Sequence, residues 1–157
     1  MSDELDEGID PRKAAFAKRE KSHQSMREYW MKNIKAFSSK LKDDNVSSII
    51  PLEAELLSRR EELVDEIARL GVSVQKDNIQ LKLIKEERLK WQIEKQQFKI
   101  TATERKIFIE ADMAYHDALV ELTKNHIEFL IDTKSTVDHF IWGIKNKIAL
   151  FKEIGLD

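Results

Sequence analysis

The sequence predicts an all-α protein whose long amphipathic helices form a helical hairpin or coiled-coil bundle and associate into an oligomer. Residues 52–157 contain no proline and only three glycines. Because proline costs about 3 kcal/mol in a helix interior, such a stretch favours long uninterrupted helices. Apolar residues recur at helical spacing, and charged residues make up 36% of the chain, against a typical value of about 25%. High charge with helical periodicity indicates elongated helices with much solvated surface.

The first part of the chain is predicted to be an acidic, disordered tail over residues 1–10, followed by a basic amphipathic helix over residues 11–42. The tail has five acidic residues and no base, whereas the helix has ten lysines and arginines against two glutamates. Asp10 can cap the helix, and Pro11 is favourable at its first position. The predicted apolar face comprises Phe16, His23, Met26, Trp30, Ile34, Phe37 and Leu41.

Residues 43–50 are predicted to form a linker, and residues 51–157 a long helical hairpin or coiled coil. The first helix of the hairpin begins near Pro51, ends near residue 100 and carries the strongest periodic signal in the chain. Its heptad pattern is typical of a coiled-coil seam with polar interruptions. The predicted self-association seam consists of Leu56, Leu63, Ile67, Leu70, Val74, Leu81, Ile84 and Trp91. These residues either pack on the chain's other helices or pair with a second copy, and the length of the helix favours pairing.

Two local signals define the helices of this hairpin. Gly71 is a candidate stop, but the heptad phase passes through it unchanged, which predicts a continuous helix. Thr101 and Glu104 have the spacing of a capping box, in which each side chain accepts a backbone hydrogen bond from the other residue. The second helix of the hairpin is therefore expected from about Thr103 to Lys152.

The sequence argues against an enzyme. It has no cysteine, no Gly-rich phosphate loop and no His-Glu-x-x-His motif, and therefore predicts no cofactor and no metal. A di-iron bundle needs two inward-facing Glu-x-x-His motifs, and no glutamate lies three residues before His116, His126 or His139. The acidic start does not resemble a secretory signal, and no apolar stretch is long enough to span a bilayer. The expected location is the cytoplasm, or a particle assembled there.

The basic helix over residues 11–42 has three interpretations. It is a solvated face of the bundle, a surface for the phosphates of single-stranded nucleic acid, or an amphipathic helix that lies on anionic lipid or in the groove of a partner protein. The candidate phosphate contacts in this helix are Arg12, Lys13, Lys18, Arg19, Lys32 and Lys35.

Residues 100–157 carry a further pattern. Glu110-Ala111-Asp112 is followed by a long amphipathic segment and then by Ile144-Lys145-Asn146-Lys147-Ile148, Phe151 and Gly155. This region resembles the phage recombination mediators, small helical proteins that load a recombinase onto single-stranded DNA. The resemblance implies an oligomeric ring that binds single-stranded DNA, with Lys145 and Lys147 as phosphate contacts.

Together these features predict a non-catalytic helical scaffold that self-associates through its seam and docks partner proteins. The partners are a second copy of the chain and another protein. A DNA-binding recombination mediator and a peripheral membrane-binding protein are the alternatives.

Overall fold

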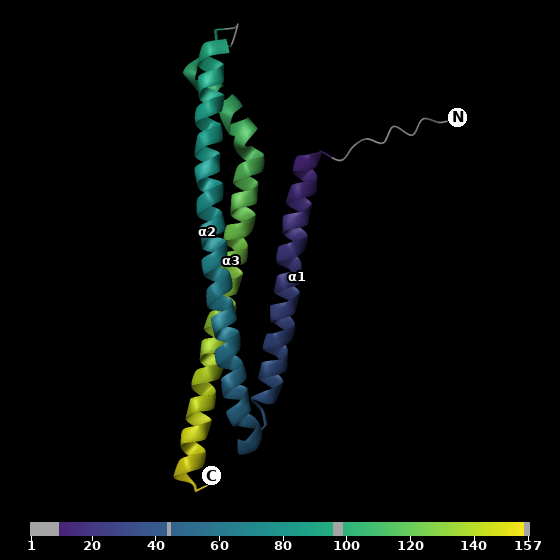
Figure 1. Ribbon diagram of the computed structural model, residues 1–157, viewed down its shortest axis with the longest axis vertical. Coiled ribbons are helices and arrows are strands. Elements are labelled where there is room, and N and C mark those ends of the chain that lie inside the picture. The colour runs from purple at the N-terminus through teal and green to yellow at the C-terminus, as the bar shows by residue number, and fades with distance from the viewer. Residues whose placement is uncertain (1–9, 44, 96–98, 156–157) are drawn as a thin grey trace, which may run out of the picture.

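The computed structural model describes residues 10–43, 45–95 and 99–155. They form three α-helices, α1 (Pro11–Lys40), α2 (Val46–Lys95) and α3 (Ala102–Glu153), and no strand occurs among these residues. Long helices α2 and α3 run antiparallel, and the shorter α1 packs beside them along part of their length (Figure 1). The predicted all-α fold of long helices is confirmed.

Two of the predicted helix starts are confirmed in atomic detail. The Asp10 side chain accepts a hydrogen bond of 2.9 Å from the backbone N–H of Arg12, and Pro11 occupies the first position of α1. The Thr101 hydroxyl accepts from the Glu104 N–H at 3.1 Å, and the Glu104 carboxylate accepts from the Thr101 N–H at 2.8 Å. These caps satisfy backbone donors that have no partner within the helix.

The connection between α1 and α2 is shorter than predicted. Helix α2 begins at Val46, not near Pro51, so Pro51 lies inside the helix. Asn45 provides the cap, because its side-chain oxygen accepts from the Ser47 N–H at 3.1 Å and its backbone carbonyl accepts from Ile49. Asparagine is among the best N-cap residues, and this signal outweighs the preference of proline for the first turn.

Helix α2 continues through Gly71, as predicted, and Lys95 is the last of its described residues. Its buried positions change register along the helix. Leu56, Val74 and Gln92 are buried at intervals of 18 residues, whereas Trp91 is 52% exposed. Eighteen residues are five turns of a straight helix, but a strict heptad drifts by about 20° per repeat. Over the five heptads from Leu56 to Trp91 this drift adds up to about 100°, so Trp91 lies about 100° around the helix axis from Leu56.

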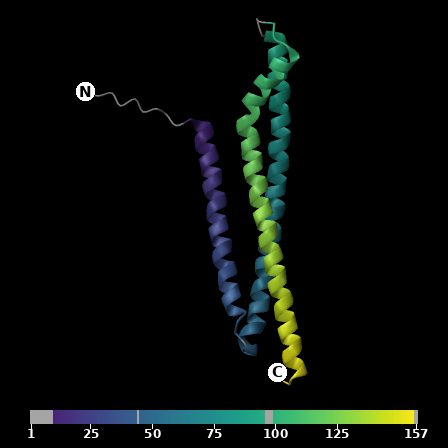
Figure 2. The same ribbon diagram turned by 180° about the vertical axis from the view of Figure 1, so that it is seen from behind.

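The core lies where all three helices run together. Its largest fully buried apolar side chains come from α1, α2 and α3 in turn: Trp30, Phe37, Ile49, Leu56, Leu63, Leu130, Val137 and Ile144. Seen from behind, α3 lies against α2 along the hairpin, while the end of the hairpin farthest from the C-terminus extends beyond α1 (Figure 2). Near the start of α3, Ile109 and Met113 are buried while Phe108 is exposed.

Candidate functional site

The predicted self-association seam lies largely inside the folded chain. Four of its residues are buried, three are half-buried, and only Trp91 is exposed. The buried residues are Leu56, Leu63, Leu70 and Val74, and the half-buried ones are Ile67, Leu81 and Ile84. The buried leucines share one core cluster with α1 and α3. This face of α2 is therefore covered by the chain itself, and self-association through it stays a prediction.

A second apolar series runs along α2 about 140° around the helix from the buried face. We call it the outer stripe of α2. It consists of Ile50, Ala54, Leu57, Val64, Ala68, Val72, Ile79, Leu83 and Ile93. Its members are separated by three, four, seven or ten residues, so they share one side of a 3.6-residue helix. The stripe extends over about 65 Å at 1.5 Å per residue.

The outer stripe is exposed to solvent in the single chain, except at Val64, which is half-buried. Ile79 is 61% exposed and Ile93 is 60% exposed, and Ile50, Leu57, Val72 and Leu83 are exposed as well. Sequence analysis did not identify this surface, because Glu61, Gln75, Glu86 and Lys90 interrupt it. A sequence signal for this surface does exist. Ile50, Leu57 and Val64 are spaced by seven residues before Gly71, and Val72, Ile79 and Ile93 are spaced by seven and fourteen residues after it.

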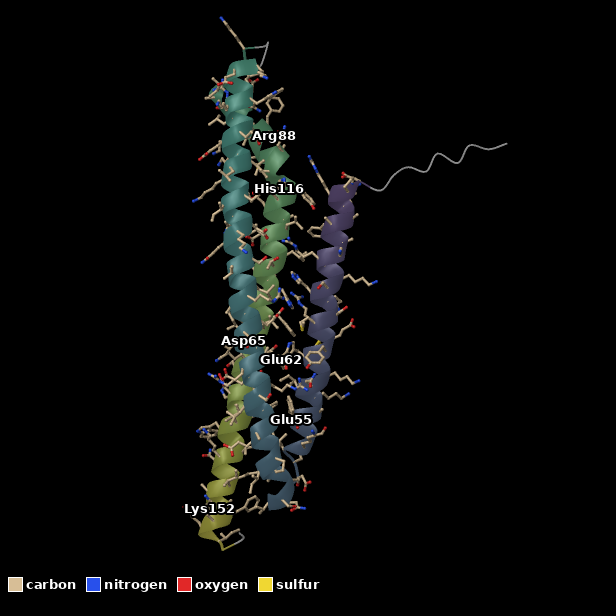
Figure 3. All side chains as sticks on the ribbon, in the orientation of Figure 1. Glu55, Glu62, Asp65, Arg88, His116 and Lys152 are labelled. Atoms are coloured by element: carbon tan, nitrogen blue, oxygen red, sulfur yellow. The ribbon has the colours of Figure 1, made fainter. Side chains whose placement is uncertain are left out.

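The outer stripe is free because α1 packs on a different side of α2. The Tyr29 hydroxyl donates to the Glu62 carboxylate at 3.3 Å, and Lys40 Nζ lies 3.1 Å from Glu55. Figure 3 shows Glu55 and Glu62 on the side of α2 toward α1, whereas Asp65 is turned away from α1. Helix α1 therefore leaves the outer stripe of α2 uncovered.

Six of the eight predicted phosphate contacts are exposed, and none of these six forms an ion pair with another described residue. They are Arg12, Lys13, Lys18, Lys32, Lys35 and Lys145. They do not form one patch, because the first turn of α1, which contains Arg12, lies far along the bundle from the C-terminal end of α3, which contains Lys145 (Figure 1). Such exposed cations are compatible with a solvated surface and with phosphate binding.

The other two predicted phosphate contacts hold the helices together. Arg19 Nη1 lies 3.0 Å from Asp77 Oδ2 and donates to Thr123 Oγ1 at 3.4 Å, which joins all three helices. Lys147 Nζ donates to the carbonyl of Leu41 at 2.8 Å and to that of Asp43 at 3.4 Å. A lysine in this position satisfies carbonyls at the C-terminus of a helix. Both cations therefore have structural partners in the folded chain.

Two histidines stack between α1 and α3. The rings of His23 and His126 are 4.3 Å apart and nearly parallel, and both side chains are buried. Burial lowers the pKa of His126 to about 4, with further lowering by His23 and Arg27. Burial also lowers the pKa of His23, helped by nearby Arg19 and Arg27. Both imidazoles are therefore neutral near pH 7 and act as packed core groups.

Among the described residues, no group of three or more His, Cys, Asp or Glu side chains is placed to hold a metal ion. His116 lies beside Arg88 near the end of the hairpin (Figure 3), and with Ile84 and Trp91 they line a shallow pocket of about 410 Å³. A larger groove of about 740 Å³ between α1 and α3 is lined by Met31, Ile34, Phe129, Phe140 and polar neighbours.

No protein-family model, curated protein or solved structure matches this chain. The fold defines an all-α three-helix bundle of long helices. Over the residues described, none of the helices carries an apolar stretch able to cross a membrane. The likeness to phage recombination mediators stays a prediction.

Proposed function

We propose that this chain is a non-catalytic helical scaffold that self-associates and docks partner proteins through exposed apolar helix faces. The observation that carries the proposal is the outer stripe of α2, a series of apolar side chains along most of a 50-residue helix that is interrupted only by Glu61, Gln75, Glu86 and Lys90. Monomeric proteins rarely expose contiguous apolar patches larger than a few hundred Å², and larger patches mark interaction sites.

The energetics of the outer stripe are compatible with reversible association. Burying the exposed part of one aliphatic side chain stabilises a complex by roughly 1 kcal/mol, about half the value for full burial. Six large side chains of the stripe are exposed, so a symmetric pair gains on the order of 12 kcal/mol. Association costs about 4–15 kcal/mol in lost freedom of motion. The gain therefore lies in the range expected for a dissociable complex.

Sedimentation velocity over a dilution series tests the proposal. The wild-type protein is expected to sediment as a species heavier than the 18.4 kDa chain and to dissociate on dilution. Ile79→Asp places a charge in the outer stripe and should weaken association at least tenfold. Met31→Asp is the matched control, because Met31 is similarly exposed at 64% but lies on α1. A wild-type protein that stays at the mass of one chain even at high concentration would contradict self-association.

A second candidate function is single-stranded nucleic-acid binding, which is favoured by the exposed cations of α1. Arg12, Lys13, Lys18, Lys32 and Lys35 have no acidic partner among the described residues. If all five contact phosphates, log K should fall with log salt at a slope of about −3.5. Fluorescence anisotropy of a labelled oligonucleotide at several salt concentrations measures this slope. Absence of binding at low salt would exclude this candidate.

Membrane binding through α1 receives less support. Its apolar face includes Trp30 and Phe37, which are each 1% exposed within the bundle. Lipid would reach these side chains only after α1 separates from α2 and α3. Flotation with anionic and neutral liposomes tests this alternative, which predicts co-flotation only with anionic lipid.

A further inference from the structure

The groove of about 740 Å³ between α1 and α3 is open to solvent in the single chain. We call it the α1–α3 groove. Four apolar side chains line it, Met31 and Ile34 from α1 and Phe129 and Phe140 from α3. Met31 is 64% exposed, whereas the other three are half-buried and pack against the core. The groove therefore continues the apolar interior of the bundle to its surface.

The α1–α3 groove has the shape of a site for another helix. Helices α1 and α3 run in the same direction, since each is antiparallel to α2 (Figure 1). The lining residues recur every three or four positions, between 31 and 42 and between 129 and 140, which is about three turns. Among them, Ser38, Ser39, Thr133 and Thr136 are smaller than the four apolar residues. Such alternation of large and small side chains forms holes that receive the side chains of a packed helix.

The two rims of the α1–α3 groove carry opposite charges. On the α1 side, Lys35 and Lys42 are exposed, and neither forms an ion pair with another described residue. On the α3 side, Asp132 is exposed and has no ion-pair partner among the described residues. The nearby acidic residues Glu28 and Asp43 do not line the groove, and each accepts a hydrogen bond from a residue outside it. Both lysines are therefore available to acidic groups of a bound molecule.

These features together specify the chemistry of the occupant. The apolar lining requires an apolar face, and the two lysines require acidic groups along the edge of that face that lies toward α1. Asp132 favours a basic group on the opposite edge. Complementary charges of this kind fix the orientation of a partner and exclude partners of the wrong charge. An amphipathic helix that lays its apolar face into a groove meets all these requirements.

We infer that the α1–α3 groove binds an amphipathic helix of a partner protein, with acidic residues on the edge that lies toward Lys35 and Lys42. This inference rests on the proposed docking of partner proteins and names its site and the chemistry of the partner. The bound helix would add a fourth helix to the bundle. The site is distinct from the outer stripe, because α2 contributes no residue to the lining of the groove.

Two synthetic peptides of about 20 residues, roughly 30 Å long as helices, test the inference. Both have leucine along one helical face, but the acidic probe has glutamate at the edges of that face and the basic probe has lysine. Fluorescence anisotropy with the full chain should show tighter binding of the acidic probe. The net charge of the chain is −2, so general attraction would favour the basic probe. Equal or tighter binding of the basic probe, or no binding of either, would overturn the inference.

Charge reversal tests the role of the two lysines. The double variant Lys35→Glu, Lys42→Glu should weaken binding of the acidic probe by about threefold to tenfold, in keeping with the modest strength of exposed ion pairs. It should strengthen binding of the basic probe, since the pairs are restored with reversed sign. Lys18→Glu with Lys21→Glu is the matched control, because both lysines are exposed on α1 but do not line the groove. Equal effects of the two double variants would contradict the inferred contacts.

Filling the groove tests the position of the site. Ser38→Trp places a large side chain in the lining and should raise the dissociation constant of the acidic probe at least about tenfold. Ser25→Trp is the matched control, because Ser25 is also exposed on α1 but does not line the groove. Its dissociation constant should equal that of the wild type, and circular dichroism should show full helicity for both variants. Equal binding by both variants would overturn the inference.

Two further measurements separate this site from self-association. Ile79→Asp in the outer stripe should leave binding of the acidic probe unchanged, and a loss would assign the probe to the outer stripe and overturn the inference. Ser38→Trp should leave self-association unchanged in sedimentation velocity, and weaker association would make a second copy the occupant. A wild-type oligomer that binds neither probe would overturn this inference and leave self-association standing. A wild-type monomer that binds the acidic probe at the groove would support this inference and contradict self-association alone.

Discussion

The two faces of α2 have similar composition but different environments. On the inner face, Leu56 and Leu63 are fully buried against the rest of the chain. On the outer face, Val72 and Ile79 are exposed by 51% and 61%. The difference is that the chain supplies α1 and α3 to cover the first face and no helix to cover the second. Apolar residues at helical spacing thus predict a packing partner for a helix, but they do not indicate whether that partner belongs to the same chain.

The largest expected effect is a charge on the inner face. Leu63→Asp removes a fully buried side chain and places an unpaired carboxylate in the core, which should lower the free energy of unfolding by more than about 4 kcal/mol. Ile79→Asp on the outer face should leave the melting temperature within a few degrees of wild type. Thermal unfolding followed by circular dichroism measures the melting temperatures of the two variants and of the wild type. Equal melting temperatures would remove the distinction between the two faces.

Acid should weaken the interior of the bundle through His23 and His126. Their pKa values are lowered in the folded chain, to about 4 for His126, so the unfolded chain binds more protons. Stability is therefore fully present above the ordinary pKa of about 6.5 and is lost as pH falls from 6.5 towards 4. The charged groups facing the pair are Arg19 and Arg27 of α1 and Glu66 and Arg69 of α2.

The expected loss is on the order of 2 kcal/mol, measured by urea unfolding at pH 7 and pH 4.5. His126→Phe should flatten this pH dependence, whereas His139→Phe, an exposed control on the same helix, should not. A pH profile unchanged by His126→Phe would show that the stacked pair does not control acid stability.

Removing the lysine that caps α1 should have a smaller effect. Lys147→Met deletes the hydrogen bonds from Nζ to the carbonyls of Leu41 and Asp43 and should cost about 1 kcal/mol of unfolding free energy. Lys145→Met is the control, because the Lys145 side chain is exposed and its loss should be neutral. Equal stabilities of the two variants in urea unfolding would contradict the capping role.

The smallest expected effect is at Gly71. Gly71→Ala improves helix propensity and should stabilise the dilute chain by up to about 1 kcal/mol, because a Cβ atom at this position meets no other atom within 4 Å. Urea unfolding at low protein concentration measures this change. A less stable variant would show that α2 requires glycine at this position.

Local signals predicted much of the fold. Caps at Asp10 and Thr101 were predicted because each involves residues close in sequence. The heptad pattern predicted the buried inner face near Leu63, but it failed at Trp91, where accumulated rotation turns the seam to Gln92. The start of α2 was misplaced because two capping signals compete, and Asn45 outweighs Pro51.

Long-range contacts were not predictable from the same signals. Arg19 pairs with Asp77, 58 residues away, and Lys147 donates to a carbonyl 106 residues away. Nothing in the local pattern distinguishes these cations from the exposed ones beside them. The outer stripe was missed for a related reason, because only the positions of α1 and α3 around α2 show which apolar series of α2 remains uncovered.

Cysteine cross-linking is the most direct test of the outer stripe as the interface. The chain has no cysteine, so each introduced thiol reports only its own position. Val72→Cys lies at the middle of the outer stripe, where two copies of α2 packed across the stripe come close in either orientation, and should form a disulfide-linked dimer under mild oxidation. Met31→Cys should not link to itself, because Met31 is exposed but lies on α1. Efficient linking at residue 72 but not at residue 31 is the predicted result. Equal linking at the two positions, or none at residue 72 where the protein sediments as a dimer, would contradict it.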